Sequence, residues 1–280
     1  MAFISSVIRS KVLNQDMNLD LFLPNDYLDK VNLTKPQAIM YFLHGFGRSG
    51  KYAKEHTAIS RYARDNNMAV VYIDAPQSWY SDGVRSGNYF TYITEELPAL
   101  LKNIFGLEYP REKTFLAGLS MGGYGTWKVG LSRPDLFGAI APLSAPSDFQ
   151  SVVDAMKKVE DGSNILGFKT FFNTFGDDLE LGEMDDPFRR LKKVSELPAE
   201  QQPRIRVMCG KQDKVLDIYQ QNVKLDRYAK TLPLADYKFW QWDGEHEEVF
   251  WDRAVLHAIA FFLENDYDEQ EIRKWRCERE

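Results

Sequence analysis

One serine in a glycine-rich turn is the residue best suited to covalent chemistry in this chain of 280 residues. Ser120 is central in residues 118–122, GLSMG, which match the pattern G-x-S-x-G. An apolar run precedes this segment and a glycine-rich helix start follows, so we predict a sharp strand-to-helix turn that exposes the central hydroxyl. The pattern indicates nucleophilic attack by Ser120, with the Met121 backbone N–H stabilising an oxyanion. The alternative is a glycine-rich turn that carries a serine by chance.

A serine hydroxyl needs a neighbouring base that accepts its proton. Where a strand runs into such a turn, the acid and then the base follow the serine along the chain. Two histidines come after Ser120, and one of them, His257, lies inside a predicted amphipathic helix as a structural residue. His246 instead follows a predicted strand at 236–242 across a short turn, at the carboxyl end of the sheet. We therefore predict that His246 is the general base.

The acid should follow the preceding strand. Asp213 lies four residues after a predicted strand at 205–209, whereas Asp217 is placed to open or cap the next helix. Asp213 is the preferred acid, and Asp217 is the alternative. The carboxylate would hold the imidazole in one tautomer and stabilise the imidazolium without accepting the proton itself.

A second glycine-rich loop, residues 44–47, follows a predicted strand at 38–43. In this arrangement such a loop donates a backbone N–H to the oxyanion. We predict that Phe46 is the donor, that Gly45 lets the backbone approach the substrate, and that His44 holds the loop through side-chain hydrogen bonds. No partner for His44 lies at metal-ligand spacing, so no metal site is expected.

Nucleotide binding is the competing interpretation of this loop. Gly45, Gly47 and Gly50 fit G-x-G-x-x-G, and Asp74 ends the next predicted strand, as in a dinucleotide-binding oxidoreductase. That interpretation leaves the serine, the acid and the base unexplained. A phosphate loop fits less well, because Tyr52 occupies the position of the Ser or Thr that would hold magnesium.

Strand and helix patterns alternate along the chain, which predicts an α/β fold with a mostly parallel central sheet and helices on both faces. The first two strands should form an antiparallel hairpin at a sheet edge, and residues 145–203 break the rhythm as an insertion over the sheet. Thr94 is a candidate helix cap, and the tail at 265–280 is charged. The predicted strands are 3–13, 19–23, 38–43, 68–73, 114–119, 137–143, 205–209 and 236–242, and the predicted helices are 57–66, 91–105, 122–131, 216–231 and 247–263.

Composition favours one globular domain spanning residues 1–280. The chain is 44% hydrophobic and 27% charged, with a net charge of −6, so it has no bulk attraction for nucleic acid or anionic lipid. Cys209 lies in a predicted buried strand and Cys277 in the tail, which is typical of a reducing compartment rather than a disulfide framework. Without a signal peptide or an apolar run of roughly 20 residues, we expect a cytoplasmic protein.

Together these segments resemble the esterase D-like group of α/β-hydrolases, and most of all its tributyrin-esterase and acetyl or feruloyl esterase branch, the carbohydrate esterase family 1 type. The resemblance runs from about residue 7 to about residue 263 and is carried by LHGFG at 43–47, SWYSD at 78–82, EEL at 95–97, GLSMGGYG at 118–125 and HEEVFWD at 246–252.

The resemblance implies an α/β-hydrolase fold and hydrolysis of short acyl or hydroxycinnamoyl esters through an acyl-enzyme, without a cofactor. It implies that Ser120, Asp213 and His246 are the triad, and that Trp79 and Tyr80 line the acyl or alcohol pocket, unless they are ordinary aromatic packing. The insertion is similar to the lid of this branch.

The expected partner is a small ester, with acylated plant-carbohydrate fragments as one class. An acyltransferase or an S-formylglutathione hydrolase-like thioesterase would use the same triad, and a non-catalytic binder would keep only the shape. Exposed apolar residues in the insertion fit either a lid or a homo-oligomer interface.

Overall fold

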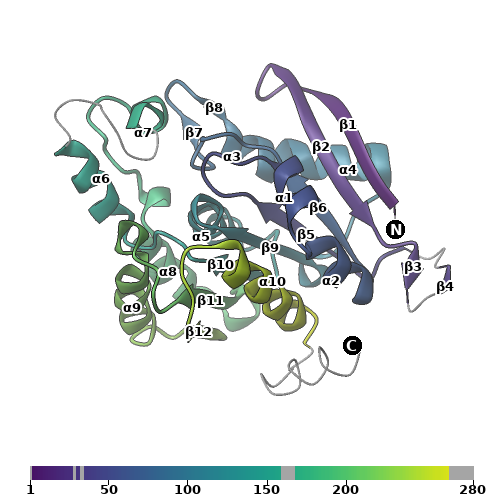
Figure 1. Ribbon diagram of the computed structural model, residues 1–280. Coiled ribbons are helices and arrows are strands. Elements are labelled where there is room, and N and C mark those ends of the chain that lie inside the picture. The colour runs from purple at the N-terminus through teal and green to yellow at the C-terminus, as the bar shows by residue number, and fades with distance from the viewer. Residues whose placement is uncertain (1, 28–29, 32–34, 159–167, 265–280) are drawn as a thin grey trace.

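An eight-stranded sheet forms the centre of the computed structural model, which describes residues 2–27, 30–31, 35–158 and 168–264. The strand order is β1-β2-β6-β5-β9-β10-β11-β12, and the six strands from β6 to β12 in that order are parallel (Figure 1). The strands are β1 (Ala2–Ser10), β2 (Gln15–Leu23), β5 (Ala38–Leu43), β6 (Met68–Ile73), β9 (Thr114–Leu119), β10 (Ala139–Leu143), β11 (Arg204–Gly210) and β12 (Tyr237–Trp242). The predicted mostly parallel sheet is confirmed.

The first two strands form the predicted antiparallel hairpin at one edge of the sheet. β1 pairs with β2 from Ala2 opposite Leu23 to Ser10 opposite Gln15, and β2 pairs antiparallel with β6. Among the described strands β1 pairs only with β2, so it is an edge strand, with β12 at the opposite edge.

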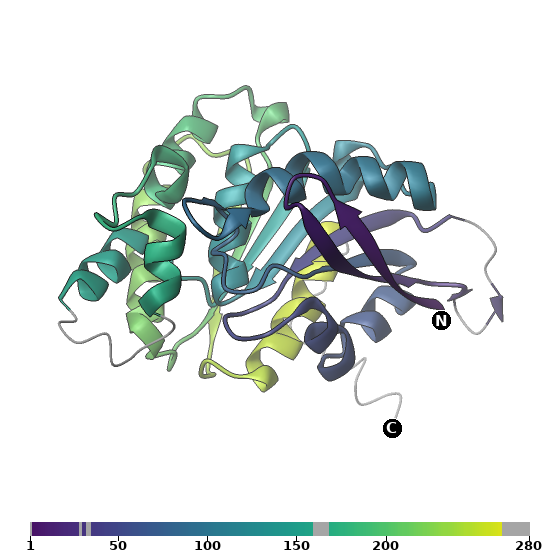
Figure 2. The same ribbon diagram turned by 90° about the horizontal axis from the view of Figure 1, so that it is seen from above.

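Helices cover both faces of the sheet (Figure 2). Each face has its own apolar core. The helices α1 (Gly50–His56), α2 (Ile59–Asp65) and α10 (Glu248–Phe262) pack on one face. The other face is covered by α4 (Leu97–Phe105), α5 (Met121–Ser132), α6 (Phe149–Lys157), α8 (Pro187–Ser195) and α9 (Ile218–Ala229). All residues of β5 and β6 are buried, as the continuous apolar runs predict.

The helix predicted at 57–66 corresponds to α2 alone, and a separate helix, α1, precedes it. Ser49 begins α1 by accepting a hydrogen bond from the Tyr52 backbone N–H at 3.1 Å. Thr57 is extended, with φ of −126°, and so separates α1 from α2, which begins only at Ile59. The prediction therefore missed α1 and placed the start of α2 two residues too early.

Thr94 does not cap a helix, so that prediction was wrong. It lies inside a continuous helical run made of α3 (Tyr89–Thr91), the π-helical η1 (Tyr92–Glu96) and α4. Its hydroxyl donates to the Phe90 carbonyl at 2.9 Å, one turn earlier, instead of accepting a bond from a helix start.

The described part of the predicted insertion packs on α5 and on a small hairpin. This part contains α6, α7 (Phe168–Phe175) and α8. The hairpin strands are β7 (Asp82–Gly83) and β8 (Gly87–Asn88), and the Val84 and Arg85 backbone N–H groups donate to carbonyls of Thr174 and Asn173 at 3.1 and 2.7 Å. Another two-stranded pair consists of β3 (Asp26–Tyr27) and β4 (Lys30–Val31).

Cys209 is buried in β11, as predicted. Cys277 and the tail at 265–280 lie outside the described residues. Within the ranges that the structure describes, no helix is long and apolar enough to cross a membrane.

Candidate active site

Ser120 lies at a sharp turn between β9 and α5. Its backbone has φ of 55° and ψ of −117°, a strained conformation for a residue other than glycine. A Cβ at position 118 would lie 2.4 Å from the Gly122 carbonyl oxygen, and one at position 122 would lie 2.0 Å from that of Leu43. Both positions therefore require glycine, which is the physical reason for the G-x-S-x-G pattern.

Three predicted residues meet at the carboxyl end of the sheet. His246 Nε2 lies 2.9 Å from Ser120 Oγ, and His246 Nδ1 lies 2.8 Å from Asp213 Oδ2. His246 comes from the loop between β12 and α10, and Asp213 from the loop after β11. The result is one hydrogen-bonded line from hydroxyl to imidazole to carboxylate.

The Asp213 carboxylate is enclosed by protein. The residue is 2% exposed, and its Oδ1 accepts a hydrogen bond from the Val215 backbone N–H at 3.2 Å. The Cys209 sulfur lies 4.0 Å from Oδ2, and burial raises the pKa of this thiol, which keeps it neutral beside the carboxylate. Asp213 is thus fixed toward His246 with little access to water.

The rival residues lie elsewhere. Asp217 is exposed and precedes α9 in a left-handed conformation, and its side chain makes no capping hydrogen bond. His257 is buried in α10, where its ring contacts those of Trp240 and Trp242. This placement agrees with its prediction as a structural histidine.

Trp251, a residue that was not predicted from the sequence, packs on the imidazole. The Trp251 ring meets the His246 ring edge-on, with centroids 4.9 Å apart and an interplanar angle of 87°. Its indole N–H donates to Ser144 Oγ at 3.1 Å. The signal was present in the segment HEEVFWD, but sequence alone did not show that the tryptophan turns back toward the histidine.

The loop at 44–47 passes directly beside the serine. A Cβ built on Gly45 would lie 2.8 Å from Leu119 Cδ1 and 3.5 Å from Ser120 Cβ. Among the described residues, neither the Phe46 nor the Met121 backbone N–H has a hydrogen-bond partner. Both N–H groups are therefore not used by the described part of the protein, as a role in binding an oxyanion requires.

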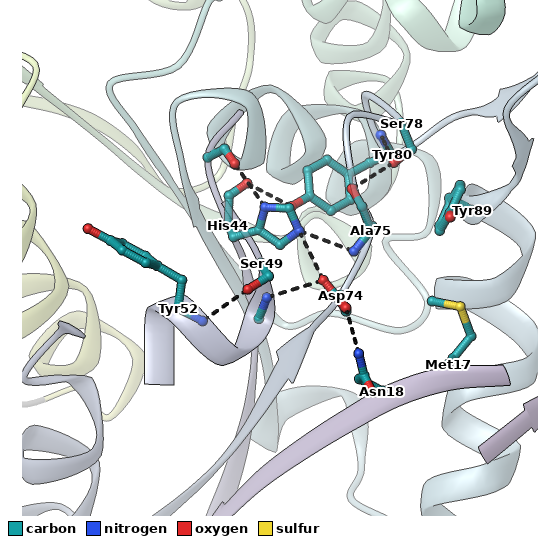
Figure 3. A network of polar contacts seen from close by, with 12 residues as sticks. Met17, Asn18, His44, Ser49, Tyr52, Asp74, Ala75, Ser78, Tyr80 and Tyr89 are labelled. Atoms are coloured by element: carbon teal, nitrogen blue, oxygen red, sulfur yellow. Dashed lines mark hydrogen bonds and ion pairs between the residues drawn. The ribbon is translucent and has the colours of Figure 1, made fainter. Parts of the chain in front are cut away.

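A buried histidine braces this loop (Figure 3). His44 Nδ1 lies 2.8 Å from the Gly45 carbonyl oxygen, and His44 Nε2 accepts the Ala75 backbone N–H at 3.1 Å, so the proton is on Nδ1. Burial lowers the pKa of His44 and keeps it neutral, although Asp74 lies 3.8 Å away. The Tyr80 hydroxyl donates to the His44 carbonyl at 2.7 Å.

Trp79 and Tyr80 are both buried behind the loop. Tyr80 has no exposed surface and packs against Gly125 of α5. Trp79 contacts the Phe46 ring at 5.9 Å between centroids and the insertion ring of Phe171 at 4.7 Å. This packing supports the loop, and contact of either residue with substrate stays a prediction.

Asp74, the acidic residue of the dinucleotide interpretation, is already used inside the protein. Asp74 accepts the Gly50 backbone N–H at 3.4 Å and the Asn18 amide at 3.3 Å (Figure 3). The glycine-rich loop thus turns toward Ser120, and its second half forms the capped start of α1.

Known proteins resemble the chain over nearly its whole length. Residues 10–262 match the family model described as putative esterase. Fluorophosphonate-binding serine hydrolase F of Staphylococcus aureus, solved with substrate bound, is 30% identical, with a TM-score of 0.78 over 94% of this chain and 98% of that chain. The S-formylglutathione hydrolase of the same organism is also 30% identical, with a TM-score of 0.76 and the same coverage.

A further relative supports assignment to the same family. The acetyl esterase of Caldicellulosiruptor saccharolyticus is 27% identical over 270 residues, which is 93% of this chain and 98% of the relative. Because residues 10–262 match the esterase family model, the dinucleotide-binding alternative is wrong. The chain belongs to the esterase family, has the α/β-hydrolase fold and is a carboxylic ester hydrolase.

Proposed function

We propose that the protein hydrolyses small esters through an acyl-enzyme, with Ser120 as nucleophile, His246 as general base and Asp213 as orienting acid. The observation that supports this most is the line of two hydrogen bonds, 2.9 and 2.8 Å long, that joins these three side chains. The strained turn and the two free backbone N–H groups supply the other parts that acyl transfer needs.

In the proposed reaction, His246 takes the Ser120 proton while the oxygen attacks the ester carbonyl carbon. The carbonyl oxygen becomes an oxyanion held by the Phe46 and Met121 N–H groups, each worth roughly 3 kcal/mol. The bond to the alkoxy group breaks as His246 protonates the leaving alcohol. A water molecule then gives a proton to His246 and attacks the acyl carbon. The bond between this carbon and Ser120 Oγ breaks, His246 returns the proton to Ser120, and the carboxylic acid product leaves.

Short acyl esters are the proposed substrates, with acetyl esters first because one relative is an acetyl esterase. A thioester is the second candidate, because an S-formylglutathione hydrolase is 30% identical. A panel of acetyl, butyryl and feruloyl esters and S-formylglutathione separates these classes by kcat/KM. Product analysis with an added alcohol separates hydrolysis from acyl transfer.

The test of the proposal is Ser120→Ala with p-nitrophenyl acetate. We expect kcat to fall at least about a thousandfold, because the nucleophile is gone. Labelling by a fluorophosphonate probe should disappear as well, while the circular dichroism spectrum stays unchanged. A variant that keeps near wild-type turnover would refute the assignment.

A further inference from the structure

Two consecutive residues at the end of β10 connect the proposed nucleophile with the proposed base. The Leu143 carbonyl accepts the Ser120 backbone N–H at 2.9 Å, so it holds the turn that carries the serine. Ser144 Oγ accepts the indole N–H of Trp251 at 3.1 Å, and that indole packs against His246. One short segment therefore contacts both the serine turn and the ring beside the imidazole.

Ser144 has a backbone conformation that is rare for serine. Its φ is 44°, and its backbone N–H donates to the Met208 carbonyl of β11 at 2.8 Å. Successive side chains of a strand point to opposite faces of the sheet, and Leu143 belongs to the core on the α10 side. A fully extended Ser144 would thus point to the other face. Its left-handed backbone instead brings the hydroxyl to the α10 side, where Trp251 packs.

A hydrogen bond at one nitrogen does not by itself fix the plane of the His246 ring. Asp213 holds Nδ1 at 2.8 Å, and the ring could still turn about that contact. The Trp251 ring limits this rotation, because the two ring centroids are 4.9 Å apart and the planes are at 87°. Edge-on aromatic pairs of this kind have a preferred geometry. The hydrogen bond to Ser144 fixes the indole in turn.

The backbone around His246 is held by other contacts. The Gly244 N–H donates to Gln212 Oε1 at 2.7 Å, and the Gln212 backbone N–H donates to the Gly244 carbonyl at 3.1 Å. The two loops lie so close that a Cβ at Gly210 would be 2.2 Å from the same carbonyl oxygen. These contacts do not involve Trp251, so a change at that position should act on the imidazole ring rather than on its loop.

We propose that Trp251, fixed by Ser144, is a positioning residue that keeps the His246 imidazole in the plane needed for proton transfer. The proposal rests on the serine esterase function proposed above. His246 has to reach two oxygens in turn, that of Ser120 and that of the leaving alcohol, and each transfer requires hydrogen-bond distance. In this role Trp251 acts through the histidine and without contact to the substrate.

Two aryl acetates of similar shape separate this role from a role in substrate binding. The leaving group of p-nitrophenyl acetate departs as a stable anion, whereas that of p-methylphenyl acetate is more basic and gains more from a proton donated by His246. A misplaced imidazole should consequently slow the p-methylphenyl ester more. The quantity to measure is the ratio of kcat/KM for p-methylphenyl acetate to kcat/KM for p-nitrophenyl acetate, because kcat/KM includes departure of the alcohol.

Trp251→Leu in the full chain is the variant that tests the proposal. We expect the ratio to fall about fivefold, which corresponds to about 1 kcal/mol and is usual for the loss of an aromatic pair. Trp240→Leu is the matched control, because Trp240 packs edge-on against His257, away from the site, with centroids 5.8 Å apart. The control should leave the ratio unchanged, and equal ratios in the two variants would overturn the proposal.

Two further variants keep the test decisive if Trp251→Leu does not fold. Ser144→Ala retains the tryptophan but removes the acceptor of its N–H, and we expect the ratio to fall about two- to threefold. Trp251→Phe keeps an aromatic ring and should give a ratio between those of wild type and Trp251→Leu. An unchanged ratio in Ser144→Ala, or a ratio in Trp251→Phe no higher than in Trp251→Leu, would overturn the proposal.

The positioning role and the esterase function fail in different ways. Thermal unfolding and fluorophosphonate labelling report whether each variant keeps its fold and a reactive Ser120. If Ser120→Ala keeps its rate, the esterase proposal is wrong. If hydrolysis depends on Ser120 but the ratio is the same in wild type and Trp251→Leu, only the role of Trp251 is wrong.

Discussion

Asp213 touches the imidazole but not the serine, so its proposed contribution is to select a tautomer. An asparagine at this position would offer an N–H to His246 Nδ1 and favour the proton on Nε2, where it cannot accept from Ser120. We expect Asp213→Asn to lower kcat for p-nitrophenyl acetate about 10⁴-fold with little change in fold. Asp217→Asn, four residues away and exposed, should remain close to wild type; similar losses in both variants would contradict the assignment.

The backbone of Ser120 should impose a measurable cost on stability. A non-glycine residue in such a conformation is strained by roughly 1–3 kcal/mol. Ser120→Gly relieves that strain, although glycine also makes the unfolded chain more flexible. We expect Ser120→Gly to be about 1 kcal/mol more stable than Ser120→Ala in urea unfolding, with both inactive. If Ser120→Gly is no more stable than Ser120→Ala, the strain in the turn does not exceed the cost of glycine's flexibility in the unfolded chain, roughly 0.4–1 kcal/mol.

For single residues, the sequence was most informative where the type of a residue and its order along the chain together limit the choice. Ser120, Asp213 and His246 were chosen from their residue types and their order, and the structure places them within hydrogen-bond distance. The Trp251 contact could not be predicted, because it depends on how the first turn of α10 faces the loop before it. The burial of Tyr80 likewise depends on packing against α5.

Helix α5 is tied to the insertion by a buried ion pair. Lys128 forms a hydrogen-bonded ion pair with Asp185 and donates to Ser81 Oγ at 2.6 Å. The Tyr124 hydroxyl, one turn earlier on α5, lies 3.3 Å from the same carboxylate. The predicted insertion is therefore anchored to the helix that begins after Ser120, the proposed nucleophile.

Removing the cation of that ion pair should lower the stability of the protein strongly. Lys128→Met would leave the Asp185 carboxylate buried without its cation, and we expect the free energy of unfolding to fall by about 3–5 kcal/mol. Urea unfolding measures the change, and Lys192→Met, at an exposed position of α8, is the control. Adding Asp185→Asn to Lys128→Met should recover part of the loss; purely additive effects would show that the pair is not coupled.

Element prediction failed where the apolar pattern is weak or interrupted. Only Gly50 and Ala53 are buried in α1, so its sequence carries no apolar stripe, and the cap at Ser49 was the sole local signal. In α5, residues 121–131 are all buried, so there is no amphipathic pattern either. That helix was predicted from its glycine-rich start, and the structure adds only one residue at each end.

The whole fold should respond to pH through His44. Its pKa in the folded protein is lowered by burial, from an ordinary value near 6.5. Below that value the unfolded chain binds a proton that the folded chain does not, so this contribution to stability is complete above pH 6.5 and is lost as the pH falls.

We therefore expect wild type to lose more stability than His44→Gln between pH 7.5 and pH 5.5, by up to about 1.4 kcal/mol per pH unit below 6.5. Urea unfolding of both proteins at the two pH values gives the difference, and titrations common to both proteins cancel. A difference that does not change with pH would mean that His44 titrates normally in the folded state.

For the molecule as a whole, the sequence predicted the class of sheet, the edge hairpin and the end of the sheet where the site lies. These follow from runs of apolar residues and from chain order. The strand order could not be derived, because β5 lies between two strands that both follow it in the chain. The contact of Lys128 with Asp185 joins residues 57 apart and has no local signature.

The two hydrogen bonds of the site join residues 126 and 33 positions apart, on loops that follow three different strands. No fragment lacking β12 contains all three side chains, and an extended chain cannot bring them together. A fluorophosphonate should consequently label Ser120 only in molecules in which the sheet has formed as far as β12, its last strand. Pulsed labelling during refolding would therefore time the completion of the native topology, independently of the recovery of helical signal.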